Sequence, residues 1–184
     1  KLKLENFIRK TSDQYNSKYI ILRYFNVAGS EKKLRSGLIS KDSKNLIQNI
    51  IDVLNKKKKK FVINGNQHKT FDGTTIRDFI HVVDLVNIHY LMMKYLLKSN
   101  KSNIFNCGYG KGFSVLDVLS IANKISKKKL NIKIGKKRKN DIIQSVANID
   151  KLKKYIKWKP RNNDLKEIIH SSLKWEKKLV NLNK

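Results

Sequence analysis

The chain has 184 residues, 40% of them hydrophobic, and its 42 Lys and Arg against 14 Asp and Glu give a formal net charge of +28. This length suffices for one sizeable domain or two small ones. The sequence has no run of eighteen or more apolar residues, no second cysteine to pair with Cys107 and no Cys/His cluster with zinc spacing. We therefore expect no membrane partner, no disulfide framework, no metal site and a reducing, cytoplasmic location.

The positive charge suggests one class of partner, because clustered cations that neutralise phosphates drive nucleic-acid binding. The excess is almost all Lys, spread over the whole length together with abundant Asn and Ile. Nucleic-acid readers concentrate Arg and aromatic residues on one face. AT-rich codons encode Lys, Asn and Ile, so we favour codon usage as the cause of the excess charge, with the lysines on a solvated surface. We interpret the lysine run 56–60 as a solvated turn. A basic nucleic-acid-binding module is kept as an alternative.

The first part of the chain alternates helical and strand patterns. Residues 2–15 place apolar side chains with the spacing of a one-sided helix. The run 19–25 is largely apolar, which predicts a strand covered on both faces, as in a parallel sheet flanked by helices. Residues 26–44 are polar and irregular, and loops of this length are often functional. A helical pattern over 46–54 and a short strand over 61–63 follow.

The middle of the chain begins with the polar, turn-rich segment 64–75, which leads into the segment 76–82. Apolar residues at helical spacing then predict a long helix over 85–96. Residues 103–106 have the pattern of another strand, and the glycine loop 108–112 after it reads as a turn between a strand and a helix.

The last part of the chain begins with Ser114 and Asp117, which form a plausible capping box for the helix that follows. Residues 130–134 alternate like a strand, Pro160 closes a short helix, and 165–173 predicts a last helix. Strands and helices thus alternate along the chain. This pattern favours an α/β or α+β layer architecture.

Three polar clusters stand out, at 23–29, 72–81 and 138–141. Each lies near the end of an apolar strand or the start of a helix, where the ligand sites of open α/β sheets collect. Two of their residues, Arg77 and Arg138, would suit a diphosphate if they share a cleft, because guanidinium groups bind phosphate oxygens in pairs. The clusters therefore define a candidate pocket.

Each of these residues also has a structural interpretation when it is taken alone. Arg77 next to Asp78 is compatible with an ion pair, Asn26 with a helix cap, and Arg138 with one surface cation among many. The glycine loop lacks the Gly-Lys-Ser/Thr ending of a phosphate-binding P-loop. The histidines and carboxylates follow neither a Ser/His/Asp order nor a paired-carboxylate pattern, which argues against a hydrolase.

Taken together, five segments resemble the UDP-glucose 4-epimerase family, a branch of the extended short-chain dehydrogenases/reductases. Residues 1–5 resemble the start of the helix that carries the lysine of the family's Tyr-x-x-x-Lys pair. Residues 22–29 are similar to the family's LRYFNxxGA signature, and 72–85 to its DGTxxRDYIHVxDLA segment. The glycine loop and the start of the next helix, 108–118, resemble its N-x-G-x-G-x-G-x-S-V segment, and 158–160 resembles its late GWKP. The resemblance covers nearly the whole chain, and several motifs in order are far more specific than any one of them.

The resemblance implies an α/β fold: the C-terminal part of a Rossmann-like extended short-chain dehydrogenase/reductase with a smaller mixed α/β substrate-binding domain. Residues 1–30 would be the tail end of the NAD-binding Rossmann-like domain. Residues 31–184 would be the sugar-nucleotide-binding region, with some segments returning to the Rossmann sheet. The chain starts without Met and within a helical pattern, so we expect position 1 to be an internal position of a longer protein.

The activity implied by the resemblance is the NAD-dependent interconversion of UDP-glucose and UDP-galactose, by an isomerase of galactose metabolism that is a homodimer at full length and has no nucleic-acid partner. The family's catalytic tyrosine would lie four positions before Lys1, so we expect the chain alone to be inactive. A related extended reductase that acts on another nucleotide sugar, as an epimerase or a dehydratase, is kept as an alternative.

The resemblance also implies roles for individual residues. Lys1 matches the family's catalytic lysine, which also holds the nicotinamide ribose, and Tyr24 and Phe25 match positions at the nicotinamide end of the cofactor. The arginines of the clusters match diphosphate ligands, and Asp141 matches the acid on the uridine ribose. The full set of expected substrate-binding residues is Asn26, Asn45, Leu46, Val62, Ile63, Asn64, Arg77, Val115, Arg138 and Asp141.

Several positions depart from the family pattern. Phe79 replaces the usual Tyr, Asn64 stands where a Phe is common, and Ser145 stands where bacterial members have a Tyr that faces the sugar. The loop 30–44 is rich in Lys where the family is more acidic. These departures leave the sugar selectivity open.

Overall fold

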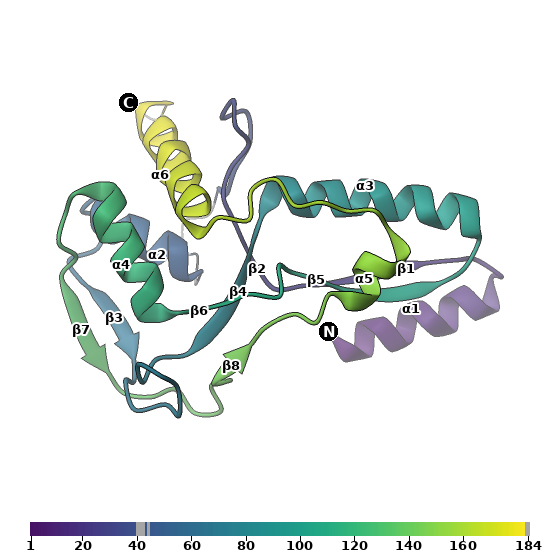
Figure 1. Ribbon diagram of the computed structural model, residues 1–184, viewed down its shortest axis with the longest axis horizontal. Helices are drawn as coiled ribbons and strands as arrows, with labels where there is room; N and C mark the ends of the chain where they lie inside the picture. Colours follow the sequence, from purple (N-terminus) through teal and green to yellow (C-terminus); the bar gives the residue numbers. More distant parts are fainter. Residues whose placement is uncertain (40–42, 44, 183–184) are drawn as a thin grey trace.

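The computed structural model describes residues 1–39, 43 and 45–182. Two groups of elements lie on either side of a set of central strands (Figure 1). We call the group of α1, β1, α3, β5 and α5 the sheet lobe, and the group of α2, β3, α4, β7 and α6 the helical lobe. The elements are α1 (Leu2–Gln14), β1 (Ile20–Tyr24), β2 (Asn26–Ala28), α2 (Leu46–Leu54), β3 (Phe61–Asn64), β4 (Ile76–His81), α3 (Val82–Ser99), β5 (Asn103–Cys107), β6 (Gly112–Ser114), α4 (Val115–Ser126), β7 (Ile132–Gly135), β8 (Gln144–Ser145), α5 (Asp150–Tyr155) and α6 (Leu165–Leu182).

The sheet lobe is built on the parallel pair of β1 and β5, in which Arg23 lies opposite Asn106. Alternate residues of a strand point to opposite faces. One face carries Leu22 and Phe105 into a core with α3 and α5, where Phe105 is 1% exposed. The helix α1 runs along the pair on the other side (Figure 1).

The helical lobe contains the second parallel pair, β3 and β7. Its core is formed by the apolar faces of α2, α4 and α6, which pack on one another and on β3. Ile50, Ile51, Ala122 and Ile169 are fully buried there. Burying such side chains stabilises a fold by about 1.5–3 kcal/mol for each large aliphatic residue. This lobe therefore has a core of its own.

The central strand β4 joins the two lobes. It pairs with β2 and β8 in parallel and with β6 in antiparallel orientation. Its successive residues Phe79 and Ile80 enter different cores, the first in the helical lobe and the second in the sheet lobe. Phe79, which replaces the family's usual Tyr, is 1% exposed. That departure therefore affects packing within the core.

The structure agrees with the helices and long strands predicted from the periodicity and differs in three short strands. It also differs at Pro160, which does not close a helix, because α5 already ends at Tyr155. Residues 26–28, predicted as the start of an irregular loop, form β2 against β4. The glycine loop ends in β6, and residues 144–145 form β8. Strands of two or three residues carry no period of their own, because pairing with β4 creates them. The boundary predicted at residue 30 remains a prediction.

Candidate functional site

A cleft of about 390 Å³ opens between the helical lobe and the central strands. All ten residues that the resemblance predicts as substrate ligands line it, although they come from segments more than one hundred positions apart. Asn26 and Arg77 enter from β2 and β4, Asn45 from the start of α2, and Arg138 from the loop after β7. We call this the first cleft.

Two asparagines fix the wall that β2 and α2 form. Asn26 donates from Nδ2 to the carbonyl of Asp78 at 2.9 Å, which ties β2 to β4 beyond their ladder. Asn45 is the N-cap of α2: its Oδ1 accepts from the backbone N–H of Ile47 at 2.9 Å, and its Nδ2 donates to the carbonyl of Val27 at 3.0 Å. The helix cap thus also sets the distance between α2 and β2. Asn26 lies in a strand and caps no helix.

The two arginines of the cleft have defined partners. Arg77 donates from Nη2 to Asp141 Oδ1 at 3.0 Å and from Nη1 to the carbonyl of Ile76 at 2.8 Å. The ion pair of Arg77 is thus with Asp141, 64 positions away, and not with its neighbour Asp78. With its side-chain oxygen turned toward the guanidinium, Asn64 accepts from Arg138 Nη2 at 3.0 Å and from Nε at 3.3 Å. Both guanidinium groups are thereby held at the cleft.

Sequence reasoning missed five polar or small residues of the first cleft: Asn49, Lys58, Lys60, Gly65 and Thr75. Asn49 lies one helical turn after Asn45, so the spacing on α2 was a usable signal. The two lysines belong to the run 56–60, in which nothing distinguishes one Lys from the next. Residues 56–60 are all exposed, as expected for a solvated turn, and two of these lysines also line the first cleft.

Part of the lysine run folds back onto the helical lobe. Lys58 Nζ forms an ion pair with Asp52 at 2.9 Å and a hydrogen bond with Asn49. Lys57 pairs with Glu176 of α6, whose side chain is 5% exposed. Asp52 and Glu176 are also bridged by the amide of Gln48. These contacts fix the turn after α2 against two helices.

A second cavity, of about 610 Å³, lies beside the sheet lobe. The three residues predicted for the cofactor, Lys1, Tyr24 and Phe25, line it. It shares two residues with the first cleft, Asn26 and Arg77. The other lining residues are Leu4, Glu5, Ile8, Ile21, Leu22, Arg23, Asn106, Ile142 and Ser145. The two hollows thus meet at the central strands, and Ser145 lies on the side of the second one.

Asp78, next to Arg77, organises the glycine loop. It is fully buried and accepts from the backbone N–H groups of Tyr109, Gly110 and Ala147 at 2.9–3.2 Å. Burial raises the pKa of Asp78, and the N–H donors act against that rise. A Cβ on Gly108 would lie 2.5 Å from Asp78 Oδ2, so only glycine fits there. Asp78 therefore holds the frame of the site rather than a ligand.

Asp84 ties the start of α3 to the chain that leads into α6. Its carboxylate, 2% exposed, accepts from Asn162 N at 2.8 Å, Asn162 Nδ2 at 3.0 Å, Arg161 N at 3.1 Å and Tyr109 Oη at 2.6 Å. Burial is the main cause that raises the pKa of Tyr109. Four donors on one buried carboxylate make it a junction between the two lobes.

His81 is buried and caps α3. Its Nδ1 accepts from the backbone N–H of Val83 at 3.2 Å, so the proton of the neutral ring lies on Nε2, which faces Ser171 Oγ at 3.2 Å. Burial lowers the pKa of His81 below its usual 6.5, against the opposite effect of Asp84 and Glu167. A proton on Nδ1 would remove the cap.

This cap predicts an acid-sensitive stability. As the pH falls, the unfolded histidine binds its proton first, near 6.5, so the stabilisation is complete above that pH and is lost as the pH falls through 6.5 toward the lower folded value. We expect urea unfolding to give a free energy that decreases between about pH 7 and about pH 5, with a smaller decrease in His81→Gln. An equal decrease in both proteins would contradict the assignment.

Other kinds of site have no support in residues 1–39, 43 and 45–182, which the structure describes. In that part of the chain, no three His, Cys, Asp or Glu side chains come together as a metal site. Burial raises the pKa of the Cys107 thiol to about 12, which makes it a poor nucleophile at neutral pH. None of the described helices has the length and apolar character to cross a membrane.

Comparison with known proteins places these features in a family. The model of the NAD dependent epimerase/dehydratase family matches residues 1–108. The UDP-glucose 4-epimerase of Halalkalibacterium halodurans is 32% identical over 96% of this chain and 53% of its own length. That of Azospirillum brasilense is 34% identical over 97% of this chain and 51% of its own length. The chain spans about half the length of the curated relatives it matches.

Solved structures agree with this result. A UDP-glucose 4-epimerase from Bifidobacterium longum, in complex with NAD+ and UDP, is 30% identical and superposes with a TM-score of 0.89 over 98% of this chain and 54% of that one. Its counterpart from Stenotrophomonas maltophila, with bound NAD and formylated UDP-arabinopyranose, is 27% identical with a TM-score of 0.92 over 99% and 55%. The predicted α/β class and extended short-chain dehydrogenase/reductase fold are confirmed. This chain therefore belongs to the NAD dependent epimerase/dehydratase family.

Proposed function

We propose that this chain provides the sugar-nucleotide-binding part of an NAD-dependent UDP-glucose 4-epimerase, an isomerase that interconverts UDP-glucose and UDP-galactose. The observation that carries the proposal is the meeting of the first cleft and the second cavity at Asn26 and Arg77. A ligand whose diphosphate lies there would have its nucleoside in one hollow and its sugar in the other. The arrangement matches the two halves of a UDP-hexose.

In this proposal the first cleft holds UDP. Arg77 and Arg138 bind the diphosphate, since both arginines line the first cleft. Asp141 uses its second oxygen for the ribose, because Oδ1 already accepts from Arg77. The nucleoside lies along α2 and β3, where its remaining contacts come from Asn45, Leu46, Val62, Ile63, Asn64 and Val115. Asn26 also contacts the sugar nucleotide.

The second cavity fits the nicotinamide end of NAD. Its lining includes the apolar side chains of Leu4, Ile8 and Ile21, together with Lys1, which supplies donors. A flat aromatic amide on a ribose needs such a surface with few donors. Lys1, Tyr24 and Phe25 would hold this end, and NAD would supply the acceptance and return of the hydride at the sugar carbon.

The division between the two hollows suits epimerisation. The sugar must present opposite faces to the cofactor in turn, so it has to be held loosely while the rest of the ligand is held firmly. Arginines on the diphosphate provide this, because binding energy remote from the reacting carbon positions the reacting carbon. Lys1 is the catalytic residue that the chain contributes. A homodimeric, cytoplasmic enzyme without nucleic-acid partners completes the proposal.

One observation favours a second candidate, the epimerisation of a different UDP sugar. Ser145 lines the second cavity, and its side chain is much shorter than the Tyr that bacterial members carry at the matching position. The resulting space suits a substituent larger than a hydroxyl. Turnover of UDP sugars with and without such a substituent distinguishes the two candidates.

Calorimetry with UDP, uridine and ADP tests the proposal on this chain. We expect UDP to bind with a Kd on the order of 10 µM and uridine at least about tenfold more weakly, because the diphosphate supplies two guanidinium contacts. ADP should bind more weakly than UDP as well. Equal affinities for all three ligands, or no measurable binding of UDP, would contradict the proposal. Turnover of UDP-galactose is then assayed on the full-length protein.

A further inference from the structure

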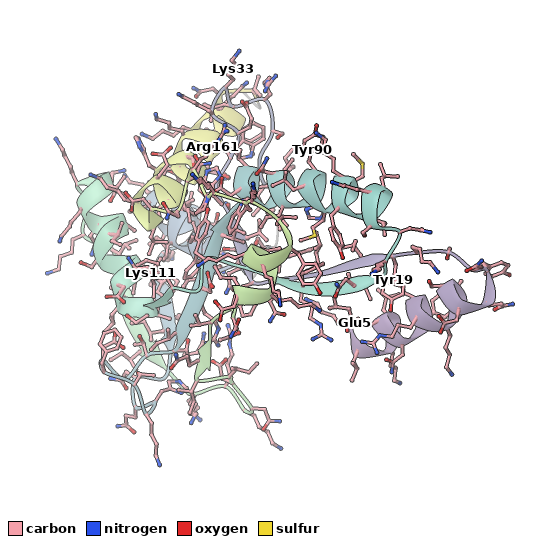
Figure 2. All side chains as sticks on the ribbon, turned by 45° about the vertical axis from the view of Figure 1, so that its right-hand side comes forward. Glu5, Tyr19, Lys33, Tyr90, Lys111 and Arg161 are labelled. Carbon is pink, nitrogen blue, oxygen red and sulfur yellow. The ribbon has the colours of Figure 1, made fainter. Side chains whose placement is uncertain are left out.

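A third hollow, of about 510 Å³, lies on the far side of the sheet lobe from α3. We call it the amide groove. Its floor is the face of β1 and β5 opposite the core, and its walls are α1 and the start of α5. Figure 2 labels Tyr19, which lines it, and Glu5 of α1 beside it. The lining residues are Arg9, Tyr19, Arg23, Ser102, Asn103, Ile104, Asn106, Asn148 and Lys151.

The amide groove is cationic. Its lining includes the cations Arg9, Arg23 and Lys151. No Asp or Glu is among the lining residues. Glu5 accepts hydrogen bonds from Nε and Nη2 of Arg23, which lower its pKa. The charge of Arg9 lowers the pKa of Glu5 further. One carboxylate therefore stands against three cations. Of the six arginines in the chain, two line the first cleft and another two line this groove.

Three polar side chains of the groove each have an acceptor oxygen that is already engaged within the chain. Asn103 Oδ1 accepts from Ile104 N at 2.9 Å, and Asn148 Oδ1 accepts from Asp150 N at 3.0 Å. Ser102 Oγ accepts from Tyr19 N at 3.1 Å. The Nδ2 groups of both asparagines have no partner among the described residues, and the Ser102 hydroxyl proton is free to donate. The groove therefore offers donors to a ligand.

These donors stand in a fixed frame. Arg23 and Asn106 are register partners on the parallel pair, so their side chains lie next to each other on the floor. Asn106 Nδ2 reaches the carbonyl of Asn148 at 3.4 Å, which joins the floor to the wall. Lys151 Nζ lies 5.1 Å from the ring centroid of Phe105, a cation–π contact that holds the ammonium group beside β5. Preorganised donors next to three cations favour an anion.

We propose that the amide groove binds a phosphomonoester of a polyhydroxylated molecule, such as a sugar phosphate, separately from the UDP-sugar. Arg9, Arg23 and Lys151 face the phosphate dianion, and the amide donors of Asn103 and Asn148 face the hydroxyls. The groove shares no lining residue with the first cleft and meets the second cavity only at Arg23 and Asn106. UDP and the phosphomonoester therefore bind at the same time.

The experiment titrates the chain with glucose 6-phosphate, inorganic phosphate and glucose, by calorimetry in phosphate-free buffer of low ionic strength. Saturating UDP blocks the first cleft in one arm, and Arg138→Gln without UDP weakens that cleft's anion site in the other. We expect glucose 6-phosphate to bind in both arms with a Kd on the order of 100 µM, and the other two ligands at least about tenfold more weakly. The Nδ2 proton signals of Asn103 and Asn148 should shift in NMR spectra.

A matched pair of variants locates the site. The double variant Arg9→Gln/Lys151→Gln should weaken glucose 6-phosphate binding at least about tenfold. The control Lys10→Gln/Lys154→Gln changes exposed neighbours on the same two helices by the same net charge and should change the affinity less than about twofold. Displacement by UDP, equal binding of inorganic phosphate, or an equal loss in both doubles overturns the proposal.

Discussion

Replacing Asp84 by Ala is expected to lower the free energy of unfolding by about 3–5 kcal/mol, because the variant removes a buried carboxylate that accepts from four donors. The donors lost are the backbone N–H groups of Arg161 and Asn162, the amide of Asn162 and the hydroxyl of Tyr109. Hydrogen bonds to a buried charge are among the strongest single contributions to stability. Urea unfolding followed by circular dichroism measures the difference.

Two comparisons make this result specific. Asp13→Ala removes an exposed carboxylate at the end of α1 and should change the free energy by less than about 0.5 kcal/mol. Asp84→Asn keeps the shape and one acceptor oxygen, so it should cost about half as much as Ala. A loss of stability in Asp84→Ala no larger than in Asp13→Ala would show that the segment 161–162 holds its place without the carboxylate.

Replacing Arg138 by Gln is expected to lower the affinity for UDP by about 10- to 100-fold and to leave the affinity for uridine unchanged, because a guanidinium contact with phosphate contributes about 1.5–3 kcal/mol. Arg138 is exposed, and its contact is with Asn64, so the fold should be unaffected. Calorimetry with both ligands on wild type and variant gives the ratio directly.

The control for this variant is Lys139→Gln, which removes the same charge from the next residue of the same loop. Lys139 is exposed and does not line the first cleft, so the affinity for UDP should fall less than about twofold. Equal effects at 138 and 139 would mean that the loop acts through its overall charge. A parallel loss of uridine binding would place Arg138 at the base instead of the diphosphate.

The long elements and the main clusters could be predicted because each has a local cause. The capping box of Ser114 and Asp117 is present with both of its hydrogen bonds. The helical period over 46–54 buries Ile47, Ile50 and Ile51, as an amphipathic helix requires. For the first cleft, motifs with a known order carried the prediction. The periodicity alone gave no reason to bring Asn45, Asn64 and Arg138 together.

The features that were missed depend on contacts between distant parts of the chain. The partner of Arg77 is 64 positions away, so the adjacent Asp78 was the obvious candidate in the sequence. Asp78 instead accepts hydrogen bonds from backbone N–H groups that reach it only when the glycine loop is folded. Lys58 lines the first cleft and contacts Asp52 and Asn49. A run of lysines in the sequence gives no sign of these contacts.

The two-faced strand β4 limits how this family member can change in length. It sends Arg77 to the first cleft, Phe79 to one core, Ile80 to the other, and His81 to the start of α3, all within five consecutive positions. Inserting or deleting one residue between 77 and 81 would turn the arginine away from the first cleft or expose an aromatic ring to water. Insertions and deletions should therefore accumulate in the turn 66–72 and be absent from this pentapeptide.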